Sequence, residues 1–324
     1  MNRRRSLIRL TFAGMLAPLA SAVRAQDFPN RPMRLVVPYP PGGGITPLAR
    51  LYGEKITEAL GQAVIVDNRP GGNTAIGTDA VAKAPPDGHT LLLTLNTHAL
   101  LPFLQQTPYD ALKDFTPIAS IAAGEQLMVV PSALPVNSLQ ELIAMAKAKP
   151  GELNYASAGA GTINHVSGES FKLATGIRMA HVPYKGGGPA IIDLIAGRVQ
   201  MYMAVPLSLI PHIESGRLKP IAITGDKRFP ALPNVPTFAE AGLAGFDARA
   251  SYWVLAPANT PRAIAERLSS ELGRISNLPD MRERLSSLGL APFVSNPDQL
   301  ARLMQADSVR FGQVVKTANI KLDN

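Results

Sequence analysis

The stretch VVPYPPGGGITPLAR, at residues 36–50, decides the fold of this chain. An apolar run typical of a buried strand ends in two prolines, and three glycines follow. Thr46 and Pro47 then predict the N-cap and the first position of a helix. A strand that turns through glycines into a helix is a building unit of α/β folds. The free N–H groups at such a helix start can also bind an anion.

Neither common nucleotide-binding motif fits this turn. If Gly42 and Gly44 are the first two glycines of G-x-G-x-x-G, Pro47 stands where the third is needed, and no Gly-Lys-Ser/Thr follows. The turn is therefore either an anion site or an ordinary strand-to-helix connection. Its spacing alone leaves both interpretations open.

Strand-like and helix-like runs alternate along the rest of the chain, which predicts an α/β fold with largely parallel sheets. The helix predicted at 46–61 ends at Gly61, a residue typical of the position after a helix. Strands are predicted at residues 33–39, 63–68, 89–96, 153–157, 179–184, 221–224 and 252–258.

Two more glycine-rich turns, at 155–168 and 182–190, each stand between a strand and a helix start. In the first, Thr162 is a candidate N-cap, and Asn164 and His165 are candidate side-chain donors. The alternative is that Thr162 only caps the helix and His165 is exposed. Because ligands of open α/β sheets lie beyond the carboxyl ends of the strands, the three turns together favour a ligand site.

The N-terminus has the pattern of an export signal. Residues 3–5 are arginines, an apolar run covers residues 7–22, and small residues lead to a cleavage site after Ala25. Without residues 1–25, 299 of the 324 residues remain. The formal net charge falls from +8 to +3, because the segment holds five of the 32 basic residues and none of the 24 acidic ones. This charge balance argues against nucleic-acid binding. From the export signal we expect the mature protein in the periplasm.

Enzyme motifs are missing. The absence of cysteine excludes disulfides, thiol catalysis and cysteine metal sites, and the five histidines show no H-E-x-x-H spacing. No G-x-S-x-G elbow occurs, since Tyr155 stands where a glycine is needed before Ser157. We therefore expect no catalysis, no metal and no cofactor.

Ordered blocks over essentially the whole mature chain resemble the tripartite tricarboxylate transporter substrate-binding proteins, also called Bug receptors. The blocks are RPMRLVVPYPPGGG (31–44), GQAVIVDNRPGG (61–72), IGTDAVAKAPPDGHTLL (76–92), PYDALKDFTPIA (108–119), LNYASAGAGT (153–162), HVPYKGGGPAIIDLIAGRVQ (181–200), PALPNVPTFAEAGL (230–243) and WVLAPANTP (253–261).

The resemblance implies a periplasmic-binding-protein fold of type II, an α/β fold with two lobes joined by two crossover strands. The apolar, proline-ended runs at 126–131 and 251–257 suit the crossovers. The implied domains are a signal peptide at 1–25, a first lobe made of 26–127 and 250–324, and a second lobe at 128–249.

The resemblance also implies that a ligand carboxylate is held between the lobes by backbone amides of the first two glycine turns, beside the loop that follows the 89–96 strand. Together with the helix-start residues, the candidate ligand-binding residues are Tyr39, Pro41, Gly42, Gly43, Gly44, Thr46, Asn96, Thr97, Ala158, Gly159, Thr162, Asn164 and Val205.

Three departures from the family pattern indicate an unusually apolar pocket. Ile45 and Thr46 stand where the family often has Thr-Asp, Ala204 and Val205 occupy a stretch that often holds an Asp, and Ala160 replaces a common Asn. The hypothesis is a small carboxylate ligand, and within that class a dicarboxylate with an apolar or aromatic body. The expected partner of this monomer is a membrane permease of the tripartite tricarboxylate type. A ligand-loaded signalling receptor for a sensor protein, or a carboxylate-processing enzyme on the same fold, are the alternatives.

Overall fold

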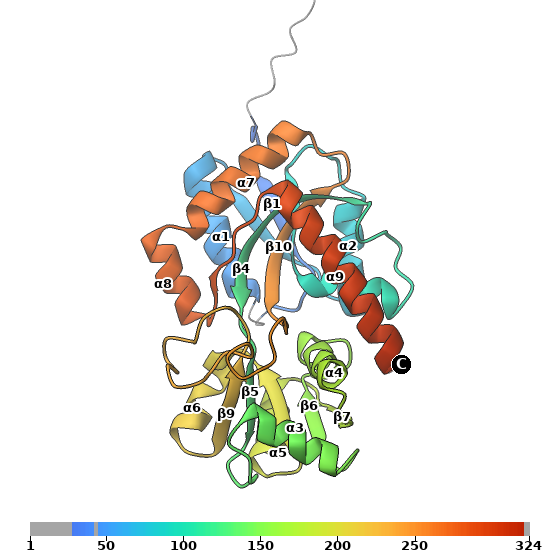
Figure 1. Cartoon of the computed structure of the whole chain (residues 1–324). Helices are drawn as coiled ribbons and strands as arrows, with labels where there is room; N and C mark the ends of the chain where they lie inside the picture. The colour runs from blue at the N-terminus through green and yellow to red at the C-terminus, as the bar shows by residue number, and fades with distance from the viewer. Residues whose placement is uncertain (1–27, 42–44, 321–324) are drawn as a thin grey trace, which may run out of the picture.

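The computed structural model describes residues 28–41 and 45–320, which form two lobes with one β-sheet each (Figure 1). The strands are β1 (Met33–Val37), β2 (Val64–Asn68), β3 (Thr90–Leu95), β4 (Phe115–Gly124), β5 (Leu127–Pro131), β6 (Asn154–Ser157), β7 (Ala180–Pro183), β8 (Met201–Ala204), β9 (Leu218–Ile223), β10 (Ala250–Pro257) and β11 (Ala291–Pro292). Their order is β11-β4-β10-β3-β1-β2 in the first sheet and β7-β6-β8-β5-β9 in the second.

Helices cover both faces of each sheet. The α-helices are α1 (Ile45–Leu60), α2 (Ala75–Ala82), α3 (Leu139–Ala148), α4 (Ile163–Thr175), α5 (Gly187–Ile195), α6 (Ile210–Glu214), α7 (Arg262–Ser276), α8 (Pro279–Ser287) and α9 (Pro297–Ala318), and the 3-10 helices are η1 (Gly72–Thr74), η2 (Asn96–Ala99), η3 (Leu101–Phe103) and η4 (Pro206–Ser208). The first sheet is buried between α1, α7 and α8 on one face and α2 and α9 on the other. The second sheet is buried between α3 and α4 on one face and α5 on the other.

The two sheets share one plan. In each, three neighbouring strands are parallel and the next strand, β10 or β5, is antiparallel to both of its neighbours. β5 has just left the first lobe and β10 has just returned from the second, so the chain crosses between the lobes twice. Every residue of both strands is buried, in keeping with their predominantly apolar sequences.

This plan confirms the type II fold with two crossover strands. It corrects one expectation, because the sheets are mixed rather than largely parallel. The predicted lobe boundaries stay a prediction. The predicted signal peptide lies outside the described residues, and among the described residues no helix is both long and apolar enough to cross a bilayer.

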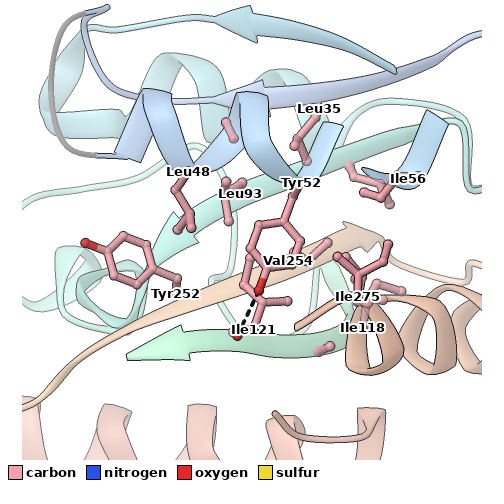
Figure 2. Close-up of a cluster of buried hydrophobic side chains, with 14 of the residues drawn as sticks. Leu35, Leu48, Tyr52, Ile56, Leu93, Ile118, Ile121, Tyr252, Val254 and Ile275 are labelled. Atoms are coloured by element: carbon pink, nitrogen blue, oxygen red, sulfur yellow. Dashed lines mark hydrogen bonds between the residues drawn. The ribbon is translucent and has the colours of Figure 1, made fainter. Parts of the chain in front are cut away.

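Helix α1, which follows the first glycine turn in sequence, packs on the first sheet (Figure 2). Leu48, Tyr52 and Ile56 recur at helical spacing on its buried face. The Tyr52 hydroxyl lies 3.1 Å from the Ile121 carbonyl oxygen, to which it donates, and 2.7 Å from the Ser276 hydroxyl. These contacts tie α1 to β4 and α7.

The predicted helix at 46–61 is confirmed, with one correction. Because α1 begins at Ile45, Thr46 lies within its first turn and is not its N-cap. The Thr46 hydroxyl instead accepts a hydrogen bond from the Asn68 side-chain amide at 3.1 Å. Gly61 follows the helix with φ 70°, a left-handed conformation that glycine adopts without strain.

Candidate functional site between the lobes

A cavity of about 420 Å³ lies between the lobes, within the size range of small-molecule sites. Its walls come from residues within 38–40, 70–74 and 95–104 of the first lobe and from 160–163 of the second. None of the described residues that line it has a charged side chain. The larger aliphatic side chains of the lining are Leu95, Leu100, Leu101 and Leu104 from the first lobe and Ile163 from the second.

Tyr39 shapes the first-lobe side of the cavity. The Asn68 side-chain amide donates to the Tyr39 carbonyl oxygen at 3.0 Å and to the Thr46 hydroxyl at 3.1 Å, which joins the end of β2 to the turn after β1. Burial raises the pKa of the Tyr39 phenol, so this group is neutral at physiological pH. The phenol oxygen lies 3.5 Å from the Thr94 hydroxyl.

The start of α4 forms the second-lobe side. Thr162 precedes the helix in an extended conformation, but its side chain accepts no helix N–H. Its hydroxyl donates instead to the Gly159 carbonyl oxygen at 2.7 Å. The first N–H groups of α4 are therefore not occupied by the Thr162 side chain, and together with the helix dipole they give this end of the cavity a positive potential.

The rim segment 71–74 has a left-handed backbone throughout, with φ values of 123° at Gly71, 56° at Gly72, 53° at Asn73 and 81° at Thr74. A β-branched residue such as Thr74 rarely adopts this conformation. Gln105 holds the segment, because its side-chain amide donates to the Gly72 carbonyl oxygen at 2.9 Å and its oxygen accepts from the Asn73 amide at 3.0 Å. Strained backbone of this kind concentrates at ligand clamps.

The comparisons with known proteins agree with this architecture. The sequence profile described as "Tripartite tricarboxylate transporter family receptor" matches residues 48–320. The chain belongs to this family. It is 38% identical, over 319 residues, to the UPF0065 protein in the tcbD-tcbE intergenic region of Pseudomonas sp. (strain P51), and the match covers 97% of this chain and 94% of that relative.

Two solved structures place the receptor among periplasmic binding proteins. R. palustris Rpa4515, solved with adipate, is 36% identical with a TM-score of 0.76, and the match covers 91% of this chain and 100% of that one. The periplasmic binding protein BugD is 30% identical with a TM-score of 0.72 and the same coverage. Receptors of this family are periplasmic solute-binding proteins and not enzymes.

Three of the predicted site residues, Tyr39, Thr97 and Thr162, line the cavity of this receptor. Two predicted polar side chains are engaged elsewhere. The Asn96 amide donates to the Arg249 carbonyl oxygen at 3.1 Å and to a carboxylate oxygen of Asp307 at 3.2 Å. The Asn164 amide donates to the Met203 carbonyl oxygen at 2.7 Å.

Other predicted residues are not among the described residues that line the cavity. Gly159 donates its N–H to Ser157, and Ala158 accepts from the N–H of the third glycine turn at Gly186. Pro41 is exposed, and Val205 precedes η4. Residues 42–44, the three glycines of the first turn, lie outside the described residues.

Sequence reasoning missed the 71–74 rim and the leucines in and beside η3, at positions 100, 101 and 104. Pro-Gly-Gly at residues 70–72, shortly after a strand, was a usable signal for the rim. Sequence reasoning also gave no indication that two of the histidines are neighbours. His165 is buried, which contradicts the alternative that it is exposed, and it stacks on His181. Within the described ranges, no group of three or more His, Cys, Asp or Glu residues could hold a metal ion.

Proposed function

We propose that this receptor captures a dicarboxylate with an apolar or aromatic body and delivers it to a membrane transporter of the tripartite tricarboxylate type. The uncharged cavity, with the start of α4 at one end, carries this proposal. Helix N–H groups bind a carboxylate without a cationic side chain, and the leucines of the lining remove an apolar ligand body from water.

The same lining disfavours amino acids. A ligand ammonium group needs a carboxylate or several oriented carbonyl groups to replace its water. No Asp or Glu is among the described lining residues. The similarity to a protein solved with adipate, an unbranched dicarboxylate, supports the same ligand class.

The proposed mechanism is capture by closure. The lobes are joined by two chain crossings, and such connections act as hinges in two-lobed binding proteins. The open form admits the ligand, and the closed form presents it to the transporter. Export to the periplasm would use the signal peptide at residues 1–25, with cleavage after Ala25.

Catalysis has one apparent argument in its favour, since Ser157 Oγ lies 2.6 Å from His181 Nε2. Ser157 is 0% exposed, and its Oγ also accepts the Gly159 N–H at 3.1 Å. A substrate carbonyl cannot reach an oxygen so enclosed. We therefore do not propose an acyl-transfer enzyme.

Matched variants at Ala160, a lining residue beside the start of α4, test the proposal. Ala160→Asp adds a negative charge where the ligand carboxylate is proposed to bind, and Ala160→Asn adds nearly the same volume without charge. We expect Asp to weaken dicarboxylate binding by at least about tenfold and Asn to change it by less than about threefold. Calorimetry with adipate, terephthalate, glutamate and adipamide measures this.

Three outcomes would contradict the proposal. The first is folded wild-type protein, free of co-purified ligand, that binds none of the acids. The second is glutamate binding more tightly than both apolar dicarboxylates. The third is equal binding of adipate and adipamide, which would show that no carboxylate is recognised.

A further inference from the structure

Two imidazoles are stacked directly behind the second glycine turn. His165, in the first turn of α4, and His181, on β7, have ring centroids 3.7 Å apart and planes 13° apart. His165 is only 5% exposed. Neither ring lines the cavity, so an effect of either ring on ligand binding must pass through the turn.

Each imidazole reaches one half of that turn. Gly161 donates its N–H to Nδ1 of His165 at 3.1 Å, so Nδ1 must be unprotonated. His181 Nε2 lies 2.6 Å from Ser157 Oγ, which in turn accepts the N–H of Gly159 at 3.1 Å. The two glycines have φ values of 138° and 74°, which only glycine adopts readily, so the turn depends on its hydrogen bonds to hold this shape.

The turn determines which groups face the ligand. The N–H groups of Gly159 and Gly161 are bonded to this rear layer, and the residues of the turn that line the cavity are Ala160, Gly161, Thr162 and, at the start of α4, Ile163. A turn that lost its rear hydrogen bonds would no longer hold these groups in place, and a backbone-built site has no long side chain that could compensate.

We propose that His165 is a positioning residue of the ligand site. Its neutral imidazole accepts the Gly161 N–H and thereby holds Ala160 and Thr162 in the orientation that binds the ligand. The effect on ligand affinity rests on the proposed function, whereas the effect on the turn does not. The other half of the turn is held by Ser157, whose Oγ accepts the Gly159 N–H and donates to the Gly159 carbonyl oxygen at 3.0 Å.

The surroundings of His165 favour the neutral ring. Burial, and secondarily the positive charge of Lys172, lower its pKa to about 4. Glu169, also on α4, is occupied by the Tyr155 hydroxyl of β6 at 2.5 Å and by Lys172 at 2.7 Å. From α9, which packs against α4, Asp307 pairs with Arg310. Among these groups, none offers a carboxylate to a protonated His165.

The test compares His165→Asn with His165→Leu. The Asn side-chain oxygen reaches the place of Nδ1 and keeps an acceptor for the Gly161 N–H, whereas Leu keeps the volume and removes the acceptor. Amide hydrogen exchange of the peptide spanning residues 157–163 reports on the turn without any ligand. Adipate calorimetry at about pH 7.5 reports on the site.

We expect the Leu variant to exchange faster at this peptide and to bind adipate at least about tenfold more weakly, and the Asn variant to stay within about threefold of wild type in both. Unchanged exchange in the Leu variant overturns the inference whatever the ligand. Equal losses in both variants also overturn it, because the acceptor would then be irrelevant. If exchange is faster in the Leu variant but not in the Asn variant, and wild type binds no adipate, the positioning role is supported and the proposed ligand class is refuted.

If the Leu variant does not fold, wild type and the Asn variant are compared between about pH 7.5 and about pH 3.5, because the lowered pKa of His165, about 4, requires the lower limit to lie below it. Ligand protonation affects both equally, but only wild type can protonate His165. We expect the wild-type affinity to fall more steeply toward the acid end of this range. Parallel profiles would overturn the inference.

Discussion

Two side-chain amides that were predicted to bind the ligand, those of Asn96 and Asn164, donate to backbone carbonyl oxygens instead. Asn164 was predicted to donate to the ligand, but its amide donates to Met203 O at 2.7 Å and so joins the first turn of α4 to the end of β8. Asn96 likewise ties η2 to the stretch before β10 through the Arg249 carbonyl. Buried polar groups need a hydrogen-bond partner, and these two amides have theirs within the protein in the absence of ligand.

Asn164→Ala separates these two roles. Loss of the bond to Met203 should lower the free energy of unfolding by about 1–2 kcal/mol, whereas ligand affinity should change by less than about threefold. Asn277→Ala is the control, because Asn277 is exposed and also donates to a backbone carbonyl, that of Gly273. Urea unfolding and calorimetry give both numbers. A large loss of affinity at unchanged stability would show that Asn164 contacts the ligand.

At the scale of elements, α4 contributes Ile163 to the cavity lining and His165 to the layer behind the second glycine turn. Gly168 lets Tyr155 lie across the helix, because a Cβ at this position would overlap the Tyr155 ring. The Tyr155 hydroxyl then reaches Glu169, and burial is the main reason why the pKa of this phenol is raised. The position of α4 on the second sheet therefore depends on one small residue.

Gly168→Ala should destabilise the protein by about 1–3 kcal/mol, although alanine has the higher helix propensity. Gly53→Ala is the control in α1, because an added Cβ there meets only Val66 and Val64, at 3.4 Å or more. That change should be neutral or stabilising by up to about 1 kcal/mol. Thermal unfolding of both variants checks the contrast, and equal midpoints would refute it.

At the scale of the whole molecule, α9 bridges the lobes. It covers the first sheet and reaches α4 of the second lobe (Figure 1). Asp307 of α9 pairs with Arg310 at 2.6 Å, and Arg310 also donates to the Asp247 carbonyl oxygen before β10. Any hinge motion must therefore move the chain past these contacts.

Global stability should fall in mild acid. Burial lowers the pKa of His98 and of His165 to about 4, below the ordinary value of about 6.5 that applies in the unfolded chain. Between these values the unfolded state binds more protons. Each histidine therefore removes up to about 1.4 kcal/mol per pH unit as pH falls through this window, with no effect above it.

His98→Gln isolates one of these contributions. His98 Nε2 lies 2.8 Å from the Ala111 carbonyl oxygen, and a Gln amide can keep that hydrogen bond without titrating. Urea unfolding between about pH 7.5 and pH 4.5 should show wild type losing stability relative to the variant. Curves that stay parallel would mean that His98 is not held neutral by burial.

The sequence by itself determined the local units and the fold class. The run at 36–50 forms a strand and a helix on either side of its glycines, and the mostly apolar runs at 126–131 and 251–257 become buried crossover strands. These features depend on neighbours along the chain, on backbone propensity and on whether a run can be buried on both faces. They do not determine the direction of the crossover strands. The sheets are mixed because both crossover strands are antiparallel to their neighbours.

Only the tertiary structure decided which side chains line the cavity and which contact one another. Tyr39, Thr97 and Thr162 line the cavity, but Asn96 and Asn164 turn away to backbone carbonyls. Packing brings together the segments that form the 71–74 rim, the leucines in and beside η3, and the stack of His165 on His181. The physical reason is that burial and hydrogen-bond satisfaction are settled among residues distant in sequence, where no local pattern records the partner.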